Sequence, residues 1–139
     1  MHRGSPDQAA MSLAMETMIR QGWGSLLPAY RQLFTSMFVT GAPLEQTASF
    51  DGLMRISASP ENAAPIFSMN NSINVIDFAW LVTVPTLVLH CRGDARIPFD
   101  EGSRLAALIP NAQFVALEGD GHMLLPGTPA FNGLLEHID

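Results

Sequence analysis

The sequence predicts an α/β protein with a helical N-terminal half followed by a βαβα unit that contains two parallel strands. Up to about residue 82, apolar side chains recur at helical spacing. Thr86–Cys91 is a short, nearly continuous apolar run, which is typical of a parallel strand buried on both faces. Beyond it the pattern alternates strand, helix, strand, helix, and such a unit makes its two strands parallel with a right-handed crossover. We therefore expect a helical region over 1–82 and a βαβα region over 83–139.

Prolines and glycines mark the ends of the predicted elements in the helical half. Helices are predicted to begin at Ser5–Pro6, after Pro28, near Pro43 and at Ser59–Pro60, and the first is predicted to end at Gly22–Gly24. Pro65 is expected to kink the fourth helix or end it early. Asn70–Ser72 then predicts a turn, and Ile76–Leu81 predicts one short helical turn.

The second half has its own boundaries. After the strand Thr86–Cys91, a helix is predicted over about Asp100–Ile109 and a second strand over Gln113–Leu117. A polar loop over Glu118–His122 follows, and the last helix is predicted over about Thr128–Ile138. The loops after the two strands are therefore expected at the same edge of the sheet.

Composition limits the classes of partner. The chain has 139 residues, enough for one domain with a core, and its net charge of −6 argues against binding nucleic acid or an anionic membrane. An apolar fraction of 47% suggests that a partner covers some apolar surface. Cys91 is the single cysteine, so no disulfide framework exists and a cytoplasmic location is expected. We find neither an apolar run of membrane-spanning length nor a secretory signal.

Asp94 and His122 are the candidate catalytic residues. Each follows a predicted strand, and functional groups gather beyond the carboxyl ends of parallel strands. A carboxylate hydrogen-bonded to one imidazole nitrogen fixes the tautomer of the ring and stabilises the imidazolium when the other nitrogen takes a proton. An acid followed by a histidine near the C-terminus is also the order of a serine–acid–histidine triad in which the serine comes earlier in the chain. We therefore predict that the two side chains meet.

Several segments resemble an α/β-hydrolase in register. Val84–His90, Gly93–Asp94 and Ile97–Pro98 look like the acid-bearing strand and loop of that family, while Ile109–Ala112 and Leu117–His122 look like the segments that lead to its catalytic histidine. The helical half, through Arg20–Gly24 and Ser59–Ala63, is similar to the cap and adjoining helices of hydrolase-like domains in some adenylate cyclases and LuxR-type regulators. The resemblance implies a partial α/β-hydrolase fold, with Asp94 and His122 as triad members and hydrolysis of an ester or related acyl bond as the parent activity.

The chain departs from that family at the nucleophile. The elbow motif G-x-S-x-G occurs nowhere, and the serines lie in loops or helical patterns without its small flanking residues (Ser25, Ser36, Ser49 and Ser103). Residue 1 is therefore expected to fall after the nucleophile, in a fragment, an expressed piece or a reduced descendant of a longer protein. Cys91 is expected to be buried and structural, and His90 to pack in or beside its strand.

No cofactor or metal is predicted. The four histidines are scattered at positions 2, 90, 122 and 137, and no second cysteine completes a metal-ligand pattern. No glycine-rich phosphate loop is present.

Three functions remain open at this point. The chain could supply the acid, the histidine and the cap of an acyl hydrolase, with a small acyl or ester ligand. It could be a non-catalytic ligand-sensing or dimerisation module of a regulator or cyclase. It could also be a stand-alone interaction protein. We expect a homodimer that covers the apolar strand Thr86–Cys91, the rival partner being a separate N-terminal hydrolase segment.

Overall fold

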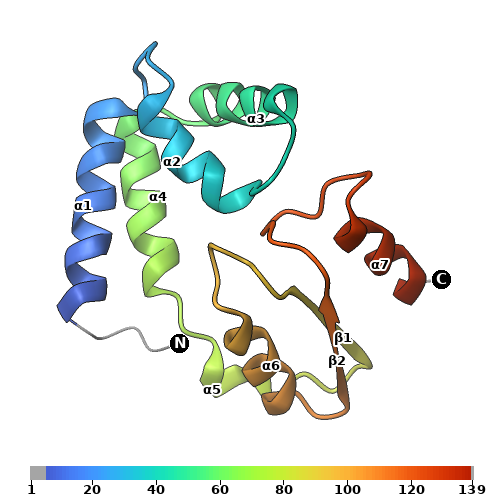
Figure 1. Cartoon of the computed structure of the whole chain (residues 1–139). Coiled ribbons are helices and arrows are strands. Elements are labelled where there is room, and N and C mark those ends of the chain that lie inside the picture. The colour runs from blue at the N-terminus through green and yellow to red at the C-terminus, as the bar shows by residue number, and fades with distance from the viewer. Residues whose placement is uncertain (1–5, 139) are drawn as a thin grey trace. The chain divides into compact units, whose positions relative to one another are not determined.

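A computed structural model describes residues 6–138 of the chain. It is a mixed α/β structure in which helices come first and a βαβα unit follows, as predicted (Figure 1). The elements in chain order are α1 (Pro6–Gly22), α2 (Ala29–Phe38), α3 (Leu44–Ser57), α4 (Pro60–Ser72), α5 (Ile76–Ala79), β1 (Thr86–Cys91), α6 (Phe99–Leu108), β2 (Ala112–Leu117) and α7 (Pro129–Ile138). No helix within this range is long and apolar enough to cross a membrane.

The chain divides into two compact units. Within the described residues the first unit comprises 6–35 and 43–74, and the second comprises 36–42 and 75–138. The second unit is therefore discontinuous in sequence, because the end of α2 and the turn after it belong with the strands.

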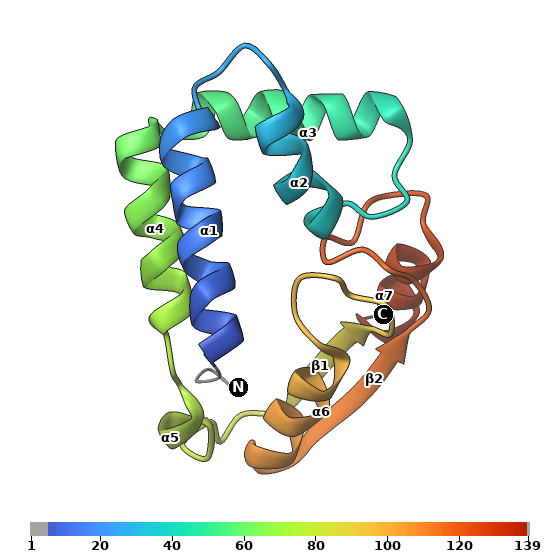
Figure 2. The same ribbon diagram turned by 60° about the vertical axis from the view of Figure 1, so that its left-hand side comes forward.

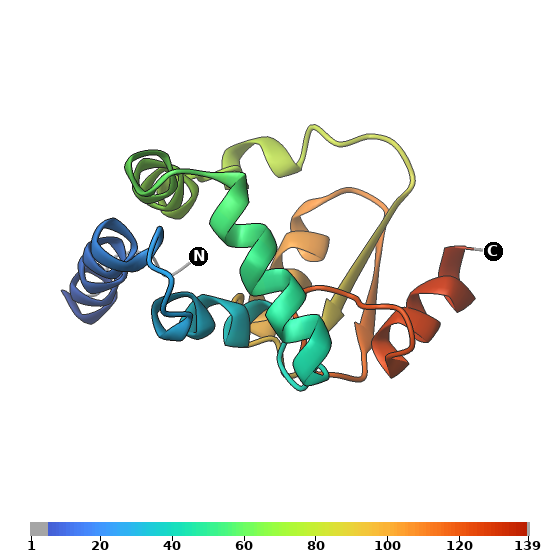
Figure 3. The same ribbon diagram turned by 90° about the horizontal axis from the view of Figure 1, so that it is seen from above.

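Helix α1 packs along α4 in the first unit (Figure 3). Ala63 and Ala64 on α4 are buried, and their small side chains let the two helices approach closely. Ile19 of α1 is fully buried, and the Phe34 ring of α2 makes edge-to-face contacts with Trp23 at 5.8 Å between centroids. Apolar residues at helical spacing form the core of this unit only in part, because Met15 and Phe34 are buried while Met11, Leu33 and Leu53 are exposed.

One expectation about α4 differs from the structure. Pro65 does not end the helix, which continues to Ser72, so the turn predicted at Asn70–Ser72 is wrong. The physical reason lies on α1. Ser68 Oγ donates a hydrogen bond to Glu16 Oε2 at 2.5 Å, and Asn71 Nδ2 donates to Ser12 Oγ at 3.2 Å. These bonds hold the second half of α4 against α1 and offset the backbone bond that Pro65 cannot make. The cap predicted at Ser5 lies outside the described residues.

A buried ion pair joins α2 to α3. The Arg31 side chain is only 3% exposed, and its Nε and Nη2 donate to Asp51 Oδ2 at 3.4 Å each. Its Nη1 donates to the backbone carbonyls of Trp23, at 2.7 Å, and Ser25, at 2.5 Å. The guanidinium thus ties the α1–α2 connection to α3. No spacing in the sequence indicates this pair.

The second unit is built on two parallel strands. β1 and β2 pair in register from Thr86 opposite Ala112 to Cys91 opposite Leu117, and α6 forms the crossover between them (Figure 2). Helices α6 and α7 cover opposite faces of this sheet (Figure 3). Ala130 of α7 packs with Cys91 and Leu117, and these three residues form the buried core.

The strand β1 is less buried than predicted. Its residues from Thr86 to His90 are only partly buried, although the His90 side chain is largely enclosed, and Cys91 alone is fully buried, so the expectation of burial on both faces is wrong for this chain. The reason is that each strand has a single neighbour in the described sheet, which leaves the outer part of each face uncovered.

The ion pair in the first unit generates a prediction about stability. Replacing Arg31 by Met leaves the buried Asp51 carboxylate and two partly buried backbone carbonyls without their partner, so the free energy of unfolding is expected to fall by about 3–5 kcal/mol. The matched control is Arg20→Met, which breaks a half-exposed i,i+4 pair with Glu16 and is expected to cost less than about 1 kcal/mol. Urea denaturation followed by helical circular dichroism measures both. Equal losses in the two variants would contradict the buried role of Arg31.

Candidate functional site

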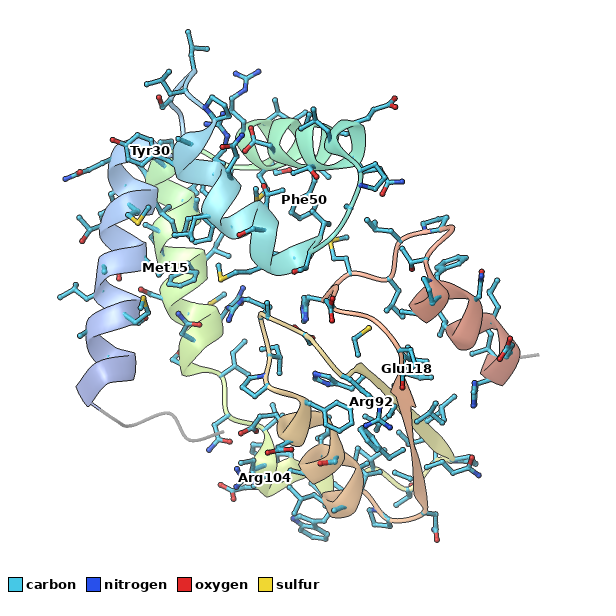
Figure 4. All side chains as sticks on the ribbon, in the orientation of Figure 1. Met15, Tyr30, Phe50, Arg92, Arg104 and Glu118 are labelled. Carbon is cyan, nitrogen blue, oxygen red and sulfur yellow. The ribbon has the colours of Figure 1, made fainter. Side chains whose placement is uncertain are left out.

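The parallel pairing brings the loops after β1 and β2 together. The strand ladder continues into these loops, where the backbone N–H groups of Arg92 and Gly93 donate to the carbonyls of Leu117 and Gly119, each at 3.0 Å. The side chains of Arg92 and Glu118, at the two strand ends, lie beside each other with Nε to Oε1 at 2.9 Å (Figure 4). The residues that follow are therefore held at one edge of the sheet.

Two glycines make this close approach possible. A Cβ at Gly93 would collide with the carboxylate of Asp120 in the facing loop. Gly119 has a φ of +151°, a backbone conformation that other residues rarely adopt. The approach of the two loops thus requires glycine at position 93, and the backbone conformation at position 119 favours glycine there.

Asp94 is nearly enclosed by its own loop. The side chain is 5% exposed, and Oδ1 accepts hydrogen bonds from the backbone N–H groups of Arg96, at 2.8 Å, and Ile97, at 2.9 Å. Burial of the carboxyl works to raise its pKa, but the hydrogen bonds from the Ile97 amide, His122 and the Arg96 amide outweigh it. The pKa of Asp94 is therefore lowered, and the group is a carboxylate at neutral pH.

The structure brings the two candidate residues together. His122 Nδ1 lies 2.8 Å from Asp94 Oδ2. Because a carboxylate only accepts hydrogen bonds, the hydrogen between them belongs to Nδ1, and in the neutral ring the lone pair is on Nε2. The His122 side chain is 34% exposed, and no described residue forms a hydrogen bond with Nε2. The arrangement is that of an oriented general base.

A segment from the helical half of the sequence completes the surroundings of His122. Phe38, in the part of α2 that belongs to the second unit, makes an edge-to-face contact with the imidazole at 5.5 Å between centroids. Its carbonyl accepts a hydrogen bond from the N–H of Met123 at 2.9 Å. The Arg96 guanidinium carbon lies 5.8 Å from the centre of the same Phe38 ring. Nothing in the sequence pattern distinguishes Phe38 from the core residues of its helix.

His90 also reaches the acid, which the sequence reasoning missed. Its side chain is largely buried beside the strand, as expected, but Nε2 lies 3.3 Å from Asp94 Oδ2. The sequence signal that could have indicated this contact is the spacing of four residues between His90, near the end of the predicted strand, and Asp94, in the loop that follows it.

Within residues 6–138, no serine hydroxyl and no thiol forms a hydrogen bond with His122. Burial raises the pKa of the Cys91 thiol, and the negative charges of Asp94 and Asp120 raise it further. Cys91 is buried, as predicted, and its raised pKa keeps the thiol protonated at neutral pH. Ser103 donates to the backbone of its own helix, and no serine between residues 6 and 138 forms a hydrogen bond with His122. Within the same range no cluster of His, Cys, Asp and Glu side chains could hold a metal ion.

The lowered pKa of Asp94 gives a testable dependence of stability on pH. The pKa in the folded protein lies below the ordinary value of 3.8, so the contribution to stability is fully present above that value. It is lost as the pH falls through the folded-state pKa. The difference in unfolding free energy between wild type and Asp94→Asn should therefore be constant above about pH 5 and shrink below about pH 4. Urea titrations at several pH values measure it, with Glu136→Gln, at an exposed position of α7, as control. A difference that persists unchanged at pH 3 would contradict the assignment.

Comparisons of the chain with models of known protein families, with curated proteins and with solved structures gave no significant match.

Proposed function

We propose that this chain supplies the acid and the general base of an α/β-hydrolase-type site for the hydrolysis of esters or related acyl bonds. Asp94 is the acid and His122 is the base. The observation that carries the proposal is the 2.8 Å contact between Asp94 Oδ2 and His122 Nδ1, made by a carboxylate whose second oxygen is already held by two backbone amides.

The placement of the pair supports this class of site. The acid follows β1, the histidine follows β2, and α6 connects the two strands, which is the arrangement expected at the C-terminal end of an α/β-hydrolase fold. In the proposed reaction, Nε2 of His122 takes the proton of the nucleophile as the nucleophile attacks the acyl carbon. Asp94 stabilises the resulting imidazolium, and the proton then passes to the leaving group.

We find no candidate for the nucleophile of the triad among the 139 residues of the sequence. The sequence contains no G-x-S-x-G, and the single thiol is buried and protonated. Without a nucleophile there is no covalent route, so the chain by itself is proposed to be inactive.

The absence of turnover is directly measurable. The purified chain is expected to hydrolyse p-nitrophenyl acetate and butyrate no faster than His122→Ala, because an oriented base without a nucleophile has nothing to activate. Asp94→Asn serves as the matched variant on the other member of the pair. Turnover above background that disappears in both variants would show that the chain contains its own nucleophile.

A second experiment tests whether the coding sequence upstream of Met1 supplies the nucleophile. A protein expressed with the upstream reading frame is expected to react with a fluorophosphonate probe at a serine outside the 139 residues. His122→Ala in that protein should slow labelling by about 10²–10⁴-fold, the usual contribution of a general base. Labelling at an unchanged rate, or an upstream frame without an elbow serine, would contradict the proposal.

A second candidate function, a non-catalytic dimerisation module, is favoured by a different observation. β1 pairs with β2 alone in the described sheet, and the segment that leads into β1 exposes large apolar side chains: Phe78, Trp80, Leu81 and Val84. A two-stranded sheet with an open apolar edge is marginal by itself, and a second copy of the chain would cover it. The edges of two Thr86–Cys91 strands would then meet, or the helical halves would be exchanged.

Light scattering on the purified chain decides between this candidate and a separate N-terminal partner. A dimer is expected at micromolar concentration, with twice the 15.1 kDa mass of one chain. Trp80→Glu, in the exposed segment before β1, is expected to shift the equilibrium to monomer, because a buried charge at an apolar interface is unfavourable. Leu26→Glu, at an exposed loop position of the first unit, is the matched control and should leave the mass unchanged. A stable wild-type monomer would exclude the dimer.

A further inference from the structure

His90, near the end of β1, is closely surrounded by other residues. Its side chain is 11% exposed and lies between the Asp94 loop and the start of α6. The ring of Phe99 meets it edge to face at 5.9 Å between centroids. Residue 102 on α6 is a glycine, and a Cβ there would collide with His90 Nδ1. A polar ring in such a confined place requires hydrogen-bond partners of the right kind.

Those partners determine which nitrogen of His90 carries the hydrogen. Nε2 lies 3.1 Å from the carbonyl oxygen of Ile97 and 3.3 Å from Asp94 Oδ2. Both oxygens are acceptors only, so Nε2 is the protonated nitrogen and donates to the Ile97 carbonyl. His90 therefore anchors the loop that contains Asp94 through a hydrogen bond to its backbone.

The hydrogen bond from His90 is the first of a series of hydrogen bonds that ends at His122. His90 Nε2 donates to the Ile97 carbonyl, and the Ile97 N–H donates to Asp94 Oδ1. The other oxygen of Asp94 accepts from His122 Nδ1. The Ile97 N–H and carbonyl lie in successive peptide planes, so holding both restricts the backbone of Ile97. Together with the Arg96 N–H, the restrained Ile97 N–H limits the orientation of the Asp94 carboxylate.

We infer that His90 is a positioning residue for the Asp94–His122 pair, which it aligns through Ile97. The inference rests on the proposed function of that pair. His90 has no part in the proton transfer. Its contribution is to keep the Asp94 loop from relaxing, since displacement of a catalytic group by about 1 Å is enough to lower activity strongly.

A packing role for His90 makes the opposite prediction from a positioning role. His90→Phe keeps an aromatic ring against Phe99 but removes the donor. His90→Gln loses the ring but places an amide nitrogen near the position of Nε2, so it can still donate to Ile97. Packing favours the phenylalanine variant, and positioning favours the glutamine variant.

The tautomer of His122 is the readout, because a purely structural role of His90 would not change it. In the protein labelled with ¹⁵N at histidine, long-range ¹H–¹⁵N correlation spectra above the titration of the ring distinguish hydrogen on Nδ1 from hydrogen on Nε2. Wild type is expected to show hydrogen on Nδ1 of His122, facing Asp94. His90→Phe is expected to lose that signal in favour of a mixture of tautomers, and His90→Gln is expected to retain it.

Each outcome has a distinct meaning. If wild-type His122 carries its hydrogen on Nε2, the proposed function of the pair is overturned. If Asp94→Asn loses the Nδ1 signal while His90→Phe keeps it, the pair stands and the positioning role of His90 is overturned. Loss of the signal in His90→Gln overturns it as well. Should His90→Phe fail to fold, His90→Asn replaces it, because asparagine fits where glutamine fits but is too short to reach Ile97.

Discussion

The backbone ladder between β1 and β2 is the constraint on which the candidate site depends. Parallel pairing with Cys91 opposite Leu117 makes both strands end at the same level, and two further backbone bonds carry the pairing into the loops. The acid and the histidine are 28 residues apart in the chain, and only this register brings them within hydrogen-bond distance. A slip of one residue would turn every side chain of one strand to the other face and separate the pair.

At the site itself, two effects act on Asp94 in opposite directions. Burial disfavours the charged carboxylate, and hydrogen bonds stabilise it. Asp94 is buried enough that its charge would be unfavourable without compensation. Compensation comes from two amides of its own loop and from His122, and it exceeds the effect of burial. Burial raises the pKa of the neighbouring Cys91 thiol, and the negative charge of Asp94 raises it further. The carboxylate that orients the base therefore also adds to the factors that keep this thiol protonated.

The parts that could be predicted from the sequence are those fixed by local pattern. The strand Thr86–Cys91 has the predicted bounds, and the meeting of Asp94 with His122 follows from the rule that parallel strands share a carboxyl edge. The parts that could not be predicted depend on contacts between distant residues. Asn71 has turn propensity, yet its bond to Ser12 keeps it in α4. Arg31 and Asp51 form a buried ion pair that no sequence spacing indicates. Phe38 contacts His122, yet in sequence it cannot be distinguished from an ordinary core residue of α2.

The discontinuous make-up of the second unit has a consequence for how the chain folds. The contact of Phe38 with the loop of His122 spans more than half of the sequence, while the strands that carry the loop are joined by a short crossover. Contacts of long sequence separation form late, because closing a large loop must precede them. The sheet and the Asp94–His122 bond can thus assemble from their own segment. Docking of the end of α2 is expected to follow, and it adds the contact of the Phe38 ring with His122.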